Sequence, residues 1–172
     1  ANLADFGEVI GSDETLREVF RAEITESVGA LRAAFDAGVP LLTGSESGFS
    51  LTPYGDWHYR ELQVFVEDLG MTPLQAINSA TEQGARALKL EGELGCIKPG
   101  YLADILVFDG EPELSVTQLG EQHRFRTIMK AGRVIDTRSP LPSNWQLPGW
   151  RVSEYSERIL TRELVESMGL TG

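Results

Sequence analysis

The feature that most limits the fold is a short apolar run, residues 39–43, that stands between a helical pattern and a polar loop. The run does not alternate apolar and polar residues, which is typical of a strand buried on both faces, as in a parallel sheet. Before it, apolar residues recur every three or four positions from Leu16 to Phe35, which predicts an amphipathic helix that ends at Gly38. A helix followed by a buried strand is half of an α/β unit, so the sequence predicts the α/β class.

The polar loop 44–48 follows this predicted strand directly, and loops at the carboxyl ends of parallel strands are where α/β folds place their active sites. Two further helices are predicted after it. One begins near Asp56 and ends at Gly70. The other opens at Thr72 with a capping box and a proline in its first turn, and continues through Leu88.

At about Gly92 the helical periodicity gives way to short β-rich runs separated by glycine and proline. Four strands are predicted, at residues 94–97, 103–108, 127–130 and 133–135. Turns are predicted at 98–100 and at 130–132, the second as a hairpin. After a linker at 139–142, a last amphipathic helix is predicted to include residues 159–165.

The 172 residues are 41% hydrophobic, which is enough to bury a core in one domain or two small ones. The formal charge of -11 argues against partners such as nucleic acid or an anionic membrane surface, because both would repel it. No apolar run approaches the roughly 20 residues that span a bilayer. With a single cysteine, Cys96, an internal disulfide is excluded, and we expect a cytoplasmic protein.

Six stretches carry a resemblance to a known family through their order and spacing. They are 37–48 (AGVPLLTGSESG), 53–62, 70–77, 80–81, 95–109 and 129–134. Together they resemble the end of imidazolonepropionase-like and prolidase-like amidohydrolases, which belong to one superfamily of metal-dependent hydrolases. The similarity covers roughly residues 31–136. It implies a (β/α)8 TIM barrel whose last strand is 39–43, and a β-sandwich built from both chain ends.

Chain length limits how much of that architecture can be present. A (β/α)8 barrel takes about 250 residues, with about 200 as a lower limit, so this chain cannot contain one. We therefore expect the C-terminal fragment of a TIM barrel in residues 1–91, part of a small β-sandwich module in 92–138, and a linker with a helix in 139–172. The expected partner is the missing N-terminal part of the barrel, in the same or a separate chain, and a homo-oligomer is a further possibility.

The resemblance implies cleavage of a non-peptide C–N bond (amide or cyclic amide) or a dipeptide-like bond of a small-molecule substrate by a metal-activated water. One or two divalent ions are expected, with zinc as the favoured metal. The family holds them with a His-x-His pair, histidines on middle strands and an aspartate that ends the last strand. This sequence has only His58 and His123, and neither lies in such a pair. The isolated chain is therefore expected to be inactive.

The resemblance implies that Glu46 occupies the position where the family usually has an aspartate. A carboxylate there is expected to contact the metal and to accept a proton from the attacking water as the catalytic base. The extra methylene moves the carboxylate by on the order of 1.5 Å, while metal sites tolerate about 0.2 Å in ligand distance, so the loop or the rotamer must compensate. The alternative is an exposed loop carboxylate without a catalytic role.

Four residues near Glu46 are candidates for substrate binding: Ser45, Ser47, Tyr54 and His58. The imidazole of His58 could bind substrate from the barrel mouth, or it could be held by a local carboxylate such as Asp56 or Glu61. Tyr54 could line the pocket or close the core.

Five other side chains are interpreted with less weight on catalysis. Trp57, like Tyr54, lines the pocket or closes the core, and Arg60 grips a substrate carboxylate or pairs with Glu61 or Asp56. His123 is expected on the surface, Cys96 as a small buried residue in a strand, and Asp104 as a residue that satisfies a turn. Two other functions remain open. The chain could be a non-catalytic scaffold or interaction domain derived from an amidohydrolase, or one chain of a split enzyme.

Overall fold

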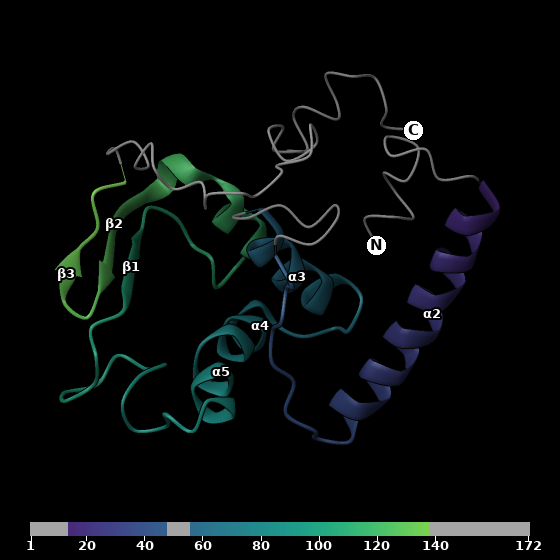
Figure 1. Cartoon of the computed structure of the whole chain (residues 1–172), viewed down its shortest axis with the longest axis horizontal. Helices are drawn as coiled ribbons and strands as arrows, with labels where there is room; N and C mark the ends of the chain where they lie inside the picture. Colours follow the sequence, from purple (N-terminus) through teal and green to yellow (C-terminus); the bar gives the residue numbers. More distant parts are fainter. Residues whose placement is uncertain (1–13, 48–55, 138–172) are drawn as a thin grey trace, which may run out of the picture.

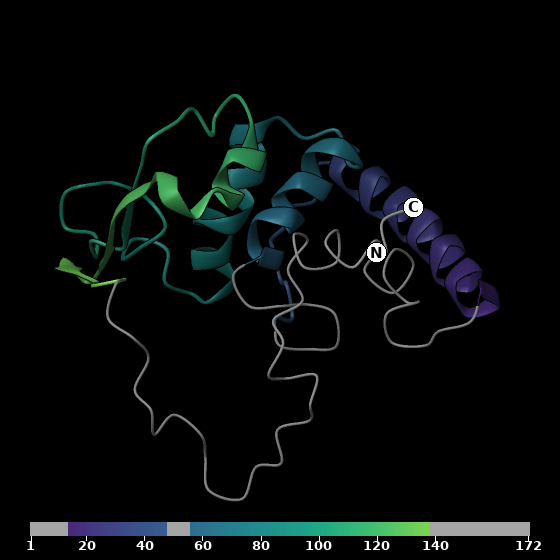
Figure 2. The same cartoon turned by 90° about the horizontal axis from the view of Figure 1, so that it is seen from above.

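The computed structural model describes residues 14–47 and 56–137 (Figure 1). Four helices come first: α2 (Glu14–Asp36), α3 (Asp56–Glu67), α4 (Pro73–Ala80) and α5 (Glu82–Ala87). They are followed by β1 (Ile105–Phe108), the 3-10 helices η2 (Val116–Gly120) and η3 (Gln122–Arg124), and the strands β2 (Phe125–Lys130) and β3 (Arg133–Val134). In both views α3, α4 and α5 lie between the long helix α2 and the small sheet (Figures 1 and 2). No helix in the described ranges is long and apolar enough to cross a membrane.

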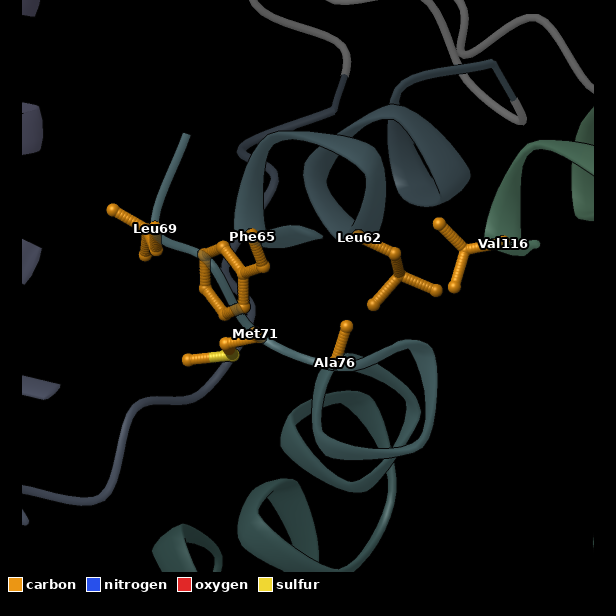
Figure 3. Close-up of a cluster of buried hydrophobic side chains, with 6 residues drawn as sticks. All are labelled: Leu62, Phe65, Leu69, Met71, Ala76 and Val116. Atoms are coloured by element: carbon orange, nitrogen blue, oxygen red, sulfur yellow. The ribbon is translucent and has the colours of Figure 1, made fainter. Parts of the chain in front are cut away.

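The core is built around α3. Leu62 and Phe65, three positions apart on α3, and Leu69 just after the helix are all buried, because residues at this spacing share one helix face. Figure 3 shows this apolar face meeting Ala76 of α4 and Val116 of η2. Residues on both sides of the predicted division at residue 92 therefore contribute to one core.

Helix α4 begins as predicted, at the capping box. The N–H of Gln75 donates to Thr72 Oγ1 at 3.3 Å, and the N–H of Thr72 donates to Gln75 Oε1 at 2.8 Å. The predicted single helix through Leu88 is wrong, however, because it breaks at Thr81 into α4 and α5. Thr81 leaves the helical region (φ -120°, ψ -85°), and its hydroxyl donates to Ile77 O at 2.8 Å. Such back-bonding by threonine bends helices.

A three-stranded antiparallel sheet in the order β1-β2-β3 confirms three of the four predicted strands. The hairpin between β2 and β3 turns through Ala131 (φ 49°) and Gly132 (φ 77°), which is the positive-φ pair that a tight two-residue hairpin requires. Asp104 Oδ1 accepts the N–H of Ala131 at 2.7 Å, so its predicted role in satisfying a turn is confirmed. A second sheet, which a sandwich needs, is not found among the described residues.

Two predicted strands are corrected. Residues 39–43 have no regular secondary structure. Within the described ranges the N–H of Val39 donates to Ala34 O at 3.0 Å, at the end of α2, and the N–H of Thr43 donates to Ser79 O at 3.4 Å, and neither bond pairs the segment with a strand. A strand exists only when a neighbour supplies its hydrogen bonds, and no other described segment pairs with this one. Residues 94–97 form no strand: Leu94 makes a single bridge with Glu91, and the chain bends at Gly95 and the half-buried Cys96. The predicted helix at 159–165 lies outside the described residues.

Candidate functional site

The first turns of α3 hold the loop that follows residues 39–43. The N–H of Gly44 donates to Glu61 Oε1 at 2.8 Å. The hydroxyl of Ser45 lies 3.0 Å from His58 Nδ1 and 2.9 Å from the hydroxyl of Ser47. Two consecutive loop residues are thus tied to one helix by two side chains.

The arrangement follows from how α3 is rotated. His58 and Glu61 are three positions apart and therefore lie on one face of the helix. The neighbouring face carries Leu62 and Phe65, whose burial against α4 and η2 fixes the rotation of the helix about its axis (Figure 3). The core thereby directs the polar face of α3 toward the loop.

Glu46 lies between the two serines that contact each other. Its side chain is exposed, and its backbone adopts a left-handed conformation (φ 48°). A residue other than glycine in this region is uncommon and marks a turn or a functional constraint. The loop therefore turns sharply at the residue that is the candidate catalytic base.

Glu61 is the ionisable side chain of this region that burial affects most clearly. Loss of solvent raises the pKa of its carboxyl above the ordinary value, while the hydrogen bond from Gly44 and the nearby His58 act in the opposite direction. The second carboxylate oxygen, Oε2, is buried and has no hydrogen-bond partner among residues 14–47 and 56–137. Burial is therefore the dominant influence on this group.

The structure brings together three of the four predicted substrate-binding residues, Ser45, Ser47 and His58, beside Glu46. Tyr54 lies outside the described residues. His58 contacts a serine hydroxyl, where sequence reasoning had considered substrate or a carboxylate. Sequence reasoning did not assign a site role to Glu61, which it considered only as a partner for His58 or Arg60. Its spacing of three from His58, next to the buried Leu62, is the signal that could have found it.

Other polar residues of the sequence lie apart from the loop or in structural contacts. The guanidinium of Arg60 lies 5.8 Å from the centre of the Trp57 ring, a cation–π contact within one turn of α3. The side chain of His123 is 77% exposed and lies 3.7 Å from Glu121, which confirms its predicted surface position.

An apolar groove of about 400 Å³ borders the segment before the loop. Its lining includes Phe35, Val39, Leu41, Met71 and Leu74, with Gln75, Asn78, Ser79 and Gln83 supplying polar atoms. Neither Glu46 nor the side chains that gather beside it line this groove. The groove and the polar loop at Glu46 are therefore separate features of the described chain.

The described side chains do not fit a complete metal centre. Among them, no three His, Cys, Asp or Glu residues are grouped so that they could hold a metal ion. A catalytic zinc site takes three protein ligands, and this loop supplies one candidate carboxylate, Glu46. Any resident ion would need ligands from outside residues 14–47 and 56–137.

Comparison with known proteins places this loop and its helices in a family. Residues 12–137 match the sequence model described as the Amidohydrolase family. The chain is 38% identical over 78 residues to an imidazolonepropionase of Rhodococcus jostii, covering 45% of the chain and 19% of that protein. It is 30% identical over 107 residues to an ochratoxinase of Aspergillus niger, covering 62% of the chain and 21% of that protein.

Solved structures show the same relationship. A putative prolidase from Bifidobacterium longum superposes with a TM-score of 0.67 at 26% identity, over 74% of this chain and 30% of that one. The ochratoxinase of A. niger superposes with a TM-score of 0.62 at 26% identity, over 72% and 28%. The chain spans about a fifth of the length of the curated relatives named above. Because the matched residues 12–137 make up most of its length, the chain belongs to the amidohydrolase family.

Proposed function

We propose that this chain is the C-terminal part of a hydrolase that cleaves an amide, cyclic amide or dipeptide-like C–N bond of a small molecule. Its family membership supports the reaction class, and its relatives include proteins named imidazolonepropionase, ochratoxinase and prolidase. In this proposal residues 39–43 become the last strand of a (β/α)8 barrel once the remaining barrel supplies neighbours. Residues 92–138 then belong to a β-sandwich module.

The observation that carries the proposal is the gathering of Ser45, Ser47 and His58 around the backbone turn at Glu46. In the proposed reaction Glu46 accepts the proton of the attacking water, because a carboxylate is a competent general base. The Ser45 hydroxyl has one donor and two acceptor positions, so its contacts with His58 and Ser47 leave capacity for one more hydrogen bond. Substrate binding by this polar group is therefore part of the proposal.

A divalent ion, with zinc as the proposed metal, would lower the pKa of a bound water and polarise the bond to be cleaved. The described residues do not hold such an ion by themselves, so its remaining ligands are proposed to come from the rest of the barrel. What this chain contributes is one carboxylate and the polar side chains that surround the loop turn.

The test is to measure steady-state kinetics of the intact protein that contains this chain, on a panel of N-acyl amino acids, Xaa-Pro dipeptides and cyclic amides. Glu46→Gln removes the base but keeps the side-chain length, so we expect kcat to fall by on the order of 10²–10⁴-fold. Glu46→Asp keeps a carboxylate and should retain more activity than the glutamine variant.

The matched control is Glu113→Gln, which makes the same change at an exposed glutamate beyond β1 and should leave kcat unchanged. Wild-type kcat in Glu46→Gln would remove this residue from the reaction. Failure of the intact protein to turn over any member of the panel would favour the scaffold alternative.

A further inference from the structure

Glu61 lies at the junction between the core and the loop. Its neighbour Leu62 is 6% exposed and packs against Ala76 and Val116, so the rotation of α3 is fixed at this point (Figure 3). One residue earlier on the helix, the Glu61 carboxylate reaches back across 17 positions of the sequence to the N–H of Gly44. The packing of Leu62 in the core thus determines where the Glu61 carboxylate meets the loop.

The loop has little backbone bonding of its own to hold its shape. Within the described residues, the backbone hydrogen bond that directly precedes the loop runs from the Thr43 N–H to Ser79 O, at a long 3.4 Å. Two positions after Gly44, Glu46 adopts a left-handed backbone conformation that residues other than glycine disfavour. Such a conformation persists only where surrounding contacts determine it.

We propose that Glu61 is a positioning residue: by accepting the Gly44 N–H it fixes the start of loop 44–47 and so holds Glu46 in its reactive orientation. This inference rests on the proposed function of Glu46. Hydrogen bonds from backbone N–H groups to a carboxylate are stronger than those to a neutral acceptor, which suits a single contact that must hold a loop. His58 assists from the same helix face through Ser45.

Burial supports this assignment. A solvent-facing carboxylate on α3 would lose little by moving, whereas Glu61 is half-buried and its pKa is raised by desolvation. Desolvation of this kind is unfavourable, and the hydrogen bond from the Gly44 N–H offsets part of it. The Glu61 carboxylate and the Gly44 N–H therefore stabilise each other, and both lose this hydrogen bond when the loop moves away from α3.

The first test does not depend on activity. In the full chain, hydrogen exchange of the Gly44 amide, followed by NMR, should become about tenfold to a hundredfold faster in Glu61→Ala. Glu61→Gln keeps a side-chain oxygen acceptor and should restore most of the protection. Glu67→Ala, the same substitution at an exposed glutamate on α3, is the matched control and should leave Gly44 unchanged.

The second test uses the intact protein. We expect Glu61→Ala to lower kcat by roughly tenfold to a hundredfold with KM little changed, and Glu61→Gln to recover most of it, since a misplaced base affects the chemical step. Unchanged Gly44 exchange in Glu61→Ala overturns the inference. Faster exchange with unchanged kcat overturns it as well, because the bond would then hold the loop without positioning Glu46.

The positioning role of Glu61 and the proposed function fail on different results. Full activity in Glu46→Gln refutes the proposed function, whatever Gly44 does. If Glu61→Ala does not fold, a pH titration of the wild-type chain tests the contact instead. The chemical shift of the Gly44 amide proton should change with pH as the Glu61 side chain ionises. In Glu61→Gln the same shift should not change with pH. A Gly44 shift that ignores that ionisation rules out the contact.

Discussion

Gly95 is the position where a single methyl group should disturb the fold most clearly. Its backbone has φ +87°, a conformation that L residues disfavour. A Cβ there would lie 2.8 Å from Ala85 Cβ, 2.9 Å from Thr81 O and 3.1 Å from Glu82 Cα. Two of these three atoms belong to the backbone at the junction of α4 and α5, so they cannot move aside as a flexible side chain would.

The cost of Gly95→Ala has two parts. The left-handed backbone contributes about 1–2 kcal/mol to the loss of stability. Overpacking against the helix junction adds about 1–3 kcal/mol. We therefore expect the free energy of unfolding to fall by roughly 2–5 kcal/mol. Gly100→Ala isolates the first part, because Gly100 has φ +88° but no atom within 4 Å of its would-be Cβ.

The assay is urea unfolding of the purified chain, followed by circular dichroism. Gly95→Ala should lower the midpoint by more than Gly100→Ala, at equal slope, since a change in midpoint without a change in slope reports stability alone. The difference between the two variants should be about 1–3 kcal/mol. Equal midpoints would refute the reasoning, because the 91–101 segment would then not be packed rigidly against α5.

Two further predictions concern the capping box and the carboxyl of Glu61. Thr72→Ala removes the acceptor for the Gln75 N–H and should lower the free energy of unfolding by about 1 kcal/mol in the same urea assay; an unchanged midpoint counts against the cap. For Glu61, whose folded pKa is raised from about 4.5, the stability contribution is present below that value and is lost as pH rises through the folded pKa. Relative to Glu61→Gln, the wild-type chain should therefore lose stability as pH rises from about 4.5, and parallel pH profiles would contradict this.

The elements that depend on short-range signals could be predicted from the sequence. The capping box at Thr72 and the hairpin turn at Ala131 and Gly132 formed as expected, because a few adjacent residues determine each of them. The break at Thr81 could not be predicted by periodicity, because it depends on one hydrogen bond, from the Thr81 hydroxyl to the Ile77 carbonyl. Residues 39–43 have a strand-like composition, but a strand requires partners, and pairing is a non-local property.

In the candidate site, too, contacts between neighbours in the chain could be predicted, and contacts between distant residues could not. Ser45 and Ser47 were expected beside Glu46 because they are its neighbours in the chain. The contact of Ser45 with His58, 13 positions away, depends on how α3 meets the loop. The sequence does not indicate a site role for Glu61, because a carboxylate on a polar helix face ordinarily faces water. Only the rotation of α3, fixed by Leu62 and Phe65, directs it to the Gly44 N–H.

The exposed apolar side chains indicate in which form of the protein activity should be measured. Leu106 and Val107 point to opposite faces of the sheet, yet they are 58% and 44% exposed, so both faces carry uncovered apolar surface. Val39 and Leu42, before the loop, are each 49% exposed. A three-stranded sheet and an unpaired extended segment gain stability from packing partners, which the proposed barrel and sandwich would supply. Residues 39–43 lead directly into loop 44–47. Partners that pair with residues 39–43 would therefore help to position the same loop that Glu61 holds. The kinetics of Glu46 and Glu61 variants therefore belong to the intact protein, whereas Gly44 exchange tests the contact that this chain makes by itself.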